Sequence, residues 1–144
     1  MKDAIAFAVS QKVIIINSAG NDRLDIDKYS KVPANYPGVI SIGANANGKG
    51  RAPFSNFGIK TVQWMVPGTD IMSAGKKDTW ATMSGTSMSA GIASASVAWL
   101  LGFGAALGIN DPQAIIVASC TDRGQWSKCG NLDIQAAALR LLDR

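Results

Sequence analysis

Apolar residues in this 144-residue chain come in short continuous runs that are separated by polar turns. Three such segments, at residues 13–16, 39–44 and 62–66, predict strands. The first is a continuous β-branched run, which is typical of a strand buried on both faces of a parallel sheet, and the second is also expected to be buried. Residues 70–83 hold two further short runs around a polar centre, which predict a β-hairpin.

Other segments show the spacing and start signals of helices. Asp111-Pro112 supplies the residues preferred at an N-cap and first helical position, and Asp133 is a second N-cap candidate. Strands that alternate with helices indicate an α/β fold, part of a doubly wound and mainly parallel sheet with helices on both faces. The predicted helices cover residues 3–10, 87–101, 112–119 and 134–142.

No residue between Asp78 and Asp111 is charged. This length raises the alternative of a membrane-spanning helix. The helix predicted at 87–101 is, however, rich in Ser, Ala and Gly, and glycines at 102, 104 and 108 are expected to interrupt the apolar stretch after it. Small residues on all sides favour a helix buried against a sheet over contact with lipid. We therefore expect no membrane span.

The overall composition changes this picture little. The length suits one domain, and the net charge of +4 comes from scattered lysines and arginines without a basic stripe, which disfavours nucleic-acid binding. Cys120 and Cys129 flank a short polar loop, where a local disulfide would suit an exported protein and two free thiols are the alternative. Two thiols without histidine fall short of a zinc site.

Two polar side chains stand out as candidates for chemistry. Ser87 precedes the long apolar helix, where the positive end of the helix and a free backbone N–H favour an oxyanion. Asn21 lies in a turn after the first predicted strand, where its carboxamide can donate a hydrogen bond to developing negative charge. Taken singly, each has a simpler interpretation, since Ser87 can cap its helix and Asn21 can be an ordinary turn residue. The chain contains no histidine and no glutamate to act as the base.

The segment around Ser87, Gly85-Thr86-Ser87-Met88-Ser89, resembles the nucleophile motif of the subtilisin-like serine proteases, the subtilases. Ala19-Gly20-Asn21 is similar to the oxyanion segment of that family. Further family blocks match in the family's order at residues 36–44, 54–58 and 66–71. The resemblance covers nearly the whole chain and implies a subtilisin-like fold.

The resemblance also implies roles for individual residues. Ser87 would be the acylating nucleophile, and its backbone N–H would form the oxyanion hole together with the side chain of Asn21. Ser18, Ala19 and Gly20 would line one wall of the pocket for the substrate residue before the scissile bond. Lys31 would approach the far end of that pocket and favour acidic or small residues there.

Departures from the family pattern are equally informative. Gly91 and Ile92 replace the usual Pro-His after the nucleophile motif, and Gln63 replaces an aspartate found beside a weak cation site, so no metal is expected there. The family's catalytic aspartate and histidine lie upstream of the Asn21 segment. Residues 1–144 thus correspond to the C-terminal portion of a subtilase peptidase domain. No cofactor is expected in this chain, and any calcium would belong to the missing part.

These observations leave two classes of function. The first is a secreted or extracytoplasmic serine endopeptidase, acting on a protein or peptide substrate once a complementary N-terminal segment supplies Asp and His; alone, this chain would be inactive or nearly so. The alternative is a catalytically inactive subtilase-like binding or scaffold module. Lys76 or Lys77 as a substitute base is less favoured, because both belong to the predicted hairpin. The related sedolisins fit less well, since they generally carry aspartate at the position of Asn21.

Overall fold

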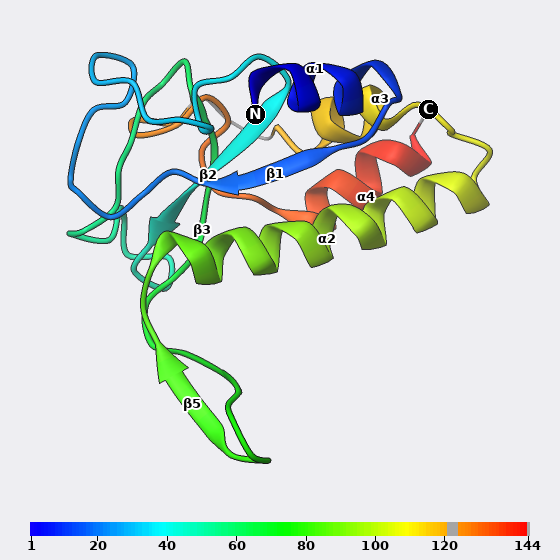
Figure 1. Cartoon of the computed structure of the whole chain (residues 1–144). Helices are drawn as coiled ribbons and strands as arrows, with labels where there is room; N and C mark the ends of the chain where they lie inside the picture. Colours follow the sequence, from blue (N-terminus) through cyan, green and yellow to red (C-terminus); the bar gives the residue numbers. More distant parts are fainter. Residues whose placement is uncertain (121–123, 144) are drawn as a thin grey trace.

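A three-stranded parallel sheet forms the centre of the protein. The computed structural model describes residues 1–120 and 124–143, without the side chains of residues 112, 113 and 117. The strands β1 (Ile15–Ser18), β2 (Val39–Asn45) and β3 (Val62–Pro67) lie side by side in that order, all parallel (Figure 1). The parallel sheet and its helices confirm the predicted α/β class.

The first strand begins two residues later than the pattern predicted. Lys12 has a left-handed backbone with φ of 61°, and the N–H of Val13 still donates to Ala8 in the preceding helix. The chain therefore enters the sheet only at Ile15, opposite Val39. All four residues of β1 are half-buried, so the expectation of burial on both faces is wrong for this strand, whereas β2 and β3 are mostly buried.

The long helix α2 (Thr86–Ala106) packs one face against the sheet. Its buried residues Ala93 and Val97 meet Ile42, Trp64 and Val66 of the strands in the main apolar core. The opposite face, including Gly91, Ala95 and Trp99, is exposed, so the expectation of a helix buried all round is wrong for the described residues.

Glycines do not end α2 where they were expected to. Gly102 and Gly104 both lie inside the helix, which continues to Ala106. A Cβ on Gly104 would approach Ile115 Cδ1 to 2.8 Å, so this glycine lets the next helix pack closely instead of breaking α2. By length and composition α2 is also able to cross a membrane, with a mean hydropathy of 1.4. Since core helices of soluble proteins share that property, its packing on the sheet is the better guide to its role.

The remaining helices agree closely with the sequence pattern. Helix α1 (Lys2–Ser10) lies on the opposite side of β1 from α2 (Figure 1). Helix α3 (Pro112–Ala118) and helix α4 (Ile134–Leu142) form a second apolar cluster with the C-terminal part of α2. Asp133 caps α4 as predicted, accepting a hydrogen bond from the N–H of Ala136 at 2.9 Å.

A hairpin extends away from the body of the protein between β3 and α2 (Figure 1). It consists of β4 (Ile71–Ala74) and β5 (Trp80–Met83), paired antiparallel, and this confirms the predicted hairpin. Lys76 and Lys77 lie in its exposed turn. Because β5 runs from that turn toward the start of α2, both lysines are at the end of the hairpin away from Ser87, which argues against a role as its base.

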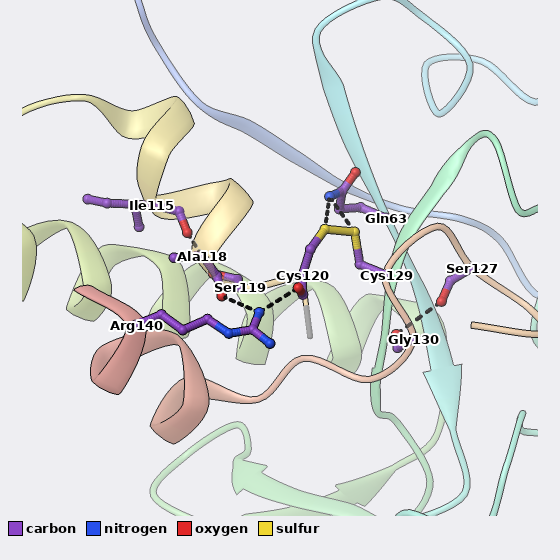
Figure 2. Close-up of a disulfide and its surroundings, with 9 residues drawn as sticks. All are labelled: Gln63, Ile115, Ala118, Ser119, Cys120, Ser127, Cys129, Gly130 and Arg140. Carbon is purple, nitrogen blue, oxygen red and sulfur yellow. Dashed lines mark hydrogen bonds between the residues drawn. A yellow bond between two sulfur atoms is a disulfide. The ribbon is translucent and has the colours of Figure 1, made fainter. Parts of the chain in front are cut away.

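Cys120 and Cys129 are joined by a disulfide between the end of α3 and the segment before α4, which runs beside β3 (Figure 2). Their Cα atoms lie 4.7 Å apart. The side-chain nitrogen of Gln63 in β3 faces both sulfur atoms, at 3.1 Å from Cys129 and 3.4 Å from Cys120. Arg140 of α4 donates to the carbonyl oxygens of Ala118 and Cys120. The disulfide thereby links the end of α3 to the segment beside β3, and Arg140 links α4 to the end of α3.

Candidate active site

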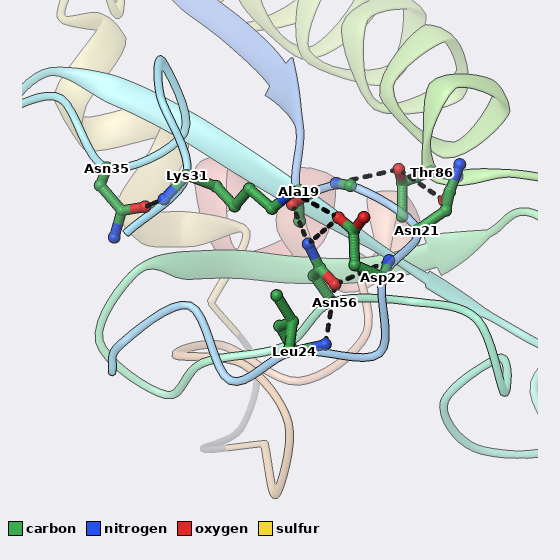
Figure 3. A network of polar contacts seen from close by, with 9 residues as sticks. Ala19, Asn21, Asp22, Leu24, Lys31, Asn35, Asn56 and Thr86 are labelled. Carbon is green, nitrogen blue, oxygen red and sulfur yellow. Dashed lines mark hydrogen bonds and ion pairs between the residues drawn. The ribbon is translucent and has the colours of Figure 1, made fainter. Parts of the chain in front are cut away.

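The carboxyl end of β1 and the start of α2 meet at one edge of the sheet, where Asn21 contacts Thr86 (Figure 3). The backbone N–H and the hydroxyl of Thr86 both donate to the side-chain oxygen of Asn21, at 3.0 Å each. The hydroxyl of Thr86 in turn accepts from the N–H of Gly20 at 3.2 Å. These bonds fix the orientation of the Asn21 carboxamide, so that its NH₂ group is left to donate elsewhere.

Ser87 is exposed at the first turn of α2, next to the buried Thr86. A Cβ built on Gly85 would lie 3.4 Å from Asn21 Nδ2 and 3.9 Å from the backbone nitrogen of Ser87. Both donors therefore border one small space, which is open because residue 85 has no side chain. Within the described residues neither donor has a hydrogen-bond acceptor. Two converging N–H groups at a helix N-terminus are suited to bind an oxyanion.

Replacing Gly85 with alanine is expected to fill this space. The new methyl group would stand where an oxyanion would lie between Asn21 and Ser87, so the peptide hydrolysis expected once an N-terminal segment is joined should fall by roughly 10²–10³ in kcat, the scale for loss of an oxyanion donor. Steady-state kinetics with a peptide substrate measure this. Gly91→Ala is the control for the added methyl group, because a Cβ there meets nothing within 4 Å. Thermal unfolding has to accompany Gly85→Ala, because φ of 158° strains an alanine at residue 85. Equal losses in the two variants would contradict the interpretation.

Asn56, which sequence reasoning quoted only as part of a family block, holds the whole loop that carries Asn21. Its side-chain oxygen accepts from the backbone N–H groups of Asp22 and Leu24, and its nitrogen donates to the carbonyl of Ala19 at 2.8 Å (Figure 3). Gly20 has φ of 100°, and a Cβ there would meet Asn56 Nδ2 at 2.6 Å. A fully buried asparagine is the feature that marks this role, and burial is not readable from the motif alone.

The remaining residues assigned to the substrate pocket lie on the same loop. Ser18 ends β1 and is half-buried, Ala19 is buried in the core under the loop, and Gly20 follows directly. The structure thus brings residues 18–20 and Asn21 together with Thr86 and Ser87.

Lys31 is engaged in an ion pair, which the sequence analysis did not anticipate. Its ammonium group lies 2.8 Å from the carboxylate of Asp22, the residue after Asn21 (Figure 3). The hydrogen bond from Lys31, and next that from Asn56, lower the pKa of Asp22 below its ordinary value. The positive charge on which a preference for acidic substrate residues was based is therefore already matched by Asp22.

Lys31→Met is expected to raise the pKa of Asp22 toward its ordinary value. A carboxyl whose pKa is lowered by folding stabilises the protein above its unfolded pKa, and that contribution is lost as pH falls through the folded value. The variant should therefore lose less stability on acidification than the parent. NMR titration of the Asp22 carboxyl carbon measures the shift. Lys28→Met, which removes the exposed partner of Asp25, should leave Asp22 unchanged.

The described residues hold no group of three or more His, Cys, Asp or Glu side chains placed to bind a metal ion. Gln63, where the sequence analysis expected no metal, directs its nitrogen toward the disulfide.

Comparison with known proteins assigns the chain to a family. The model of the subtilase family, peptidase S8, matches residues 1–131. This chain belongs to the subtilase family. Subtilisin-like protease 2 of Pseudogymnoascus destructans is 35% identical over 117 residues, covering 80% of this chain and 28% of that protein. Subtilisin-like serine protease Pen ch 13 of Penicillium rubens is 39% identical over 101 residues, covering 70% of this chain and 25% of that protein.

Solved structures give the same result for the fold. The prenylagaramide maturation protease PagA superposes with a TM-score of 0.82 at 29% identity, covering 97% of this chain and 54% of that chain. The self-cleaved protease domain of PatA gives a TM-score of 0.82 at 27% identity, and the match covers 99% of this chain and 55% of that chain. The expected family and fold are thereby confirmed. This chain spans roughly a quarter of the length of these curated relatives and about half of the length of the two solved chains.

Proposed function

We propose that this chain is the C-terminal portion of a subtilase peptidase domain that hydrolyses peptide bonds by acyl transfer. The observation that carries the proposal is the space bordered by Asn21 Nδ2 and the N–H of Ser87, beside an exposed serine hydroxyl. Ser87 attacks the substrate carbonyl, and the two donors stabilise the oxyanion that forms. The substrate is a protein or peptide, and no cofactor takes part.

The proton of Ser87 requires a base from outside this chain. The sequence contains no histidine, and the two lysines of the hairpin turn lie away from Ser87. A complementary N-terminal segment supplies the histidine and aspartate in this proposal. Alone, the chain is inactive or nearly so, because a nucleophilic serine without its base loses most of its catalytic rate.

The open side of β1 supports the proposed docking of that segment. In the described residues β1 pairs only with β2, and its other edge is free. A groove of about 450 Å³ runs beside it, between Ile14, Ile15 and Ile16 on one side and Val97, Ala98 and Leu101 of α2 on the other. Unpaired strand edges and exposed apolar surface favour association with another strand. A strand added here in parallel would end at the edge of the sheet where Asn21 and Ser87 lie.

Labelling with a fluorophosphonate tests the proposal. This probe forms a covalent bond with an activated serine, so the chain alone should stay unlabelled, whereas the chain joined to its upstream segment should be labelled at Ser87. Ser87→Ala in the joined protein is the control, and mass spectrometry of the labelled peptide identifies the site. Absence of labelling in the joined protein would reject the protease and favour the alternative, an inactive binding or scaffold module.

Disulfide formation between Cys120 and Cys129 supports a secreted or extracytoplasmic location, because oxidising compartments favour such bonds. Detection of the chain in culture medium or periplasm, with the disulfide intact by non-reducing mass spectrometry, tests this location. Recovery of the reduced chain from the cytoplasm alone would reject it.

A further inference from the structure

A cavity distinct from the groove beside β1 lies at the amino ends of the strands, opposite the candidate active site. It has a volume of about 680 Å³ and is bordered by Ile14 just before β1, Val39 at the start of β2 and Gln63 near the start of β3. Asn21 and Ser87 lie at the carboxyl ends of the strands, so the two sites are separated by the length of the sheet. The volume falls within the range of about 300–1,000 Å³ that is typical of small-molecule sites.

The walls of this cavity are largely aliphatic. Val9 and Val13 are 37% and 53% exposed, although valine side chains usually avoid water. Ile40 of β2 and Ile116 of α3 complete the apolar lining. Val13 lies outside β1 because the chain enters the sheet late, so its side chain borders the cavity instead of packing in the core. An apolar ligand would cover these groups and remove them from water.

The charged groups at the cavity favour an anion. Lys12 and Lys128 both line it, and Asp111 is the single acidic residue among the described lining residues. The amide of Gln63 also borders the cavity, and its nitrogen faces the disulfide (Figure 2). Two lysines against one aspartate among the described lining residues oppose a metal cation here and attract negative charge.

We propose that this cavity binds an amphipathic carboxylate, with its aliphatic tail against Val9, Val13 and Ile116 and its head group held by Lys12 and Lys128. The proposal combines the two features of the lining, since an apolar tail alone would not use the lysines and a small anion would leave the valines exposed. Binding needs neither Ser87 nor a base, so the proposal is independent of the protease function.

Isothermal titration calorimetry with dodecanoate, below its micelle concentration, tests the site. Dodecanoate should bind the protein with one site, whereas butyrate and dodecyltrimethylammonium should bind at least about tenfold more weakly, because each lacks the tail or the negative head. The Lys12→Met, Lys128→Met double variant should weaken dodecanoate binding by roughly tenfold or more. Lys49→Met, at an exposed turn outside the cavity, should have no effect.

A second pair of variants separates charge from loss of apolar surface. Val13→Asp places a carboxylate in the cavity and should abolish binding, whereas Val13→Asn, of nearly equal size, should retain more of it. Ser87→Ala should bind dodecanoate with the same affinity as the parent protein. Failure of dodecanoate to bind, equal binding of dodecyltrimethylammonium, or indifference to the lysine pair would each overturn the proposal. Loss of binding when the upstream segment is joined would overturn it too, since another part of the protein would then occupy the cavity.

Discussion

Ser87→Ala in the protein joined to its upstream segment is expected to lower kcat for peptide hydrolysis on the order of 10⁶-fold, the scale established for the nucleophile of subtilisin. The effect is this large because the serine oxygen forms the covalent bond to the substrate, and nothing else in the exposed first turn of α2 can replace it. Steady-state kinetics with a chromogenic peptide measure kcat and KM, and single-turnover assays measure the loss in the chemical step.

The control is Ser10→Ala, which removes an exposed hydroxyl from the end of α1. That hydroxyl donates to the carbonyl of Phe7, one turn earlier, and lies outside the proposed docking groove. Activity should therefore stay within about twofold of the parent, since surface substitutions of this kind change stability by about 0.5 kcal/mol or less. If Ser87→Ala kept substantial activity, another residue would be the nucleophile and the proposed mechanism would be wrong.

Asn21→Ala in the same joined protein is expected to lower kcat by roughly 10²–10³ with little change in KM, again the scale known for the oxyanion asparagine of subtilisin. The Nδ2 donor contributes mainly when negative charge develops on the substrate oxygen, so its loss raises the barrier more than it weakens substrate binding. Steady-state kinetics separate the two parameters.

A stability measurement has to accompany this variant, because Asn21 also accepts two hydrogen bonds from Thr86. Thermal unfolding followed by circular dichroism shows whether the start of α2 is disturbed. Asn47→Gly is a suitable control, since Asn47 is an exposed turn residue whose φ of 50° suits glycine. A loss of activity fully explained by unfolding, or a rise in KM alone, would contradict the role in oxyanion binding.

The sequence pattern was most reliable where local physics decides the structure. The hairpin, the cap at Asp133 and the strand at Val62 follow from turn residues, capping and β-branched runs, and all appear nearly where predicted. The late start of β1 was not predictable, because it depends on how α1 ends, with a left-handed Lys12 and a hydrogen bond from Val13 back to Ala8. The extension of α2 through Gly104 depends on its contact with Ile115, which only tertiary packing reveals.

The candidate site shows the same division. Ser87 and Asn21 could be proposed from their motifs, and the structure brings their segments together. Asn56 and the ion pair between Asp22 and Lys31 could not be assigned, because both depend on how loops far apart in the sequence fold onto each other. A motif gives the residue type, whereas the partner of a side chain is a property of the folded chain.

The length of α2 has a consequence for the serine at its start. With 21 residues the helix is about 30 Å long, and a helix of this length is stiff. Its other end is held by Leu100 and by the close approach of Gly104 to Ile115, in the cluster with α3 and α4. α2 therefore connects the candidate active site, where Thr86 bonds to Asn21, with the distant cluster of α3 and α4 through one continuous element.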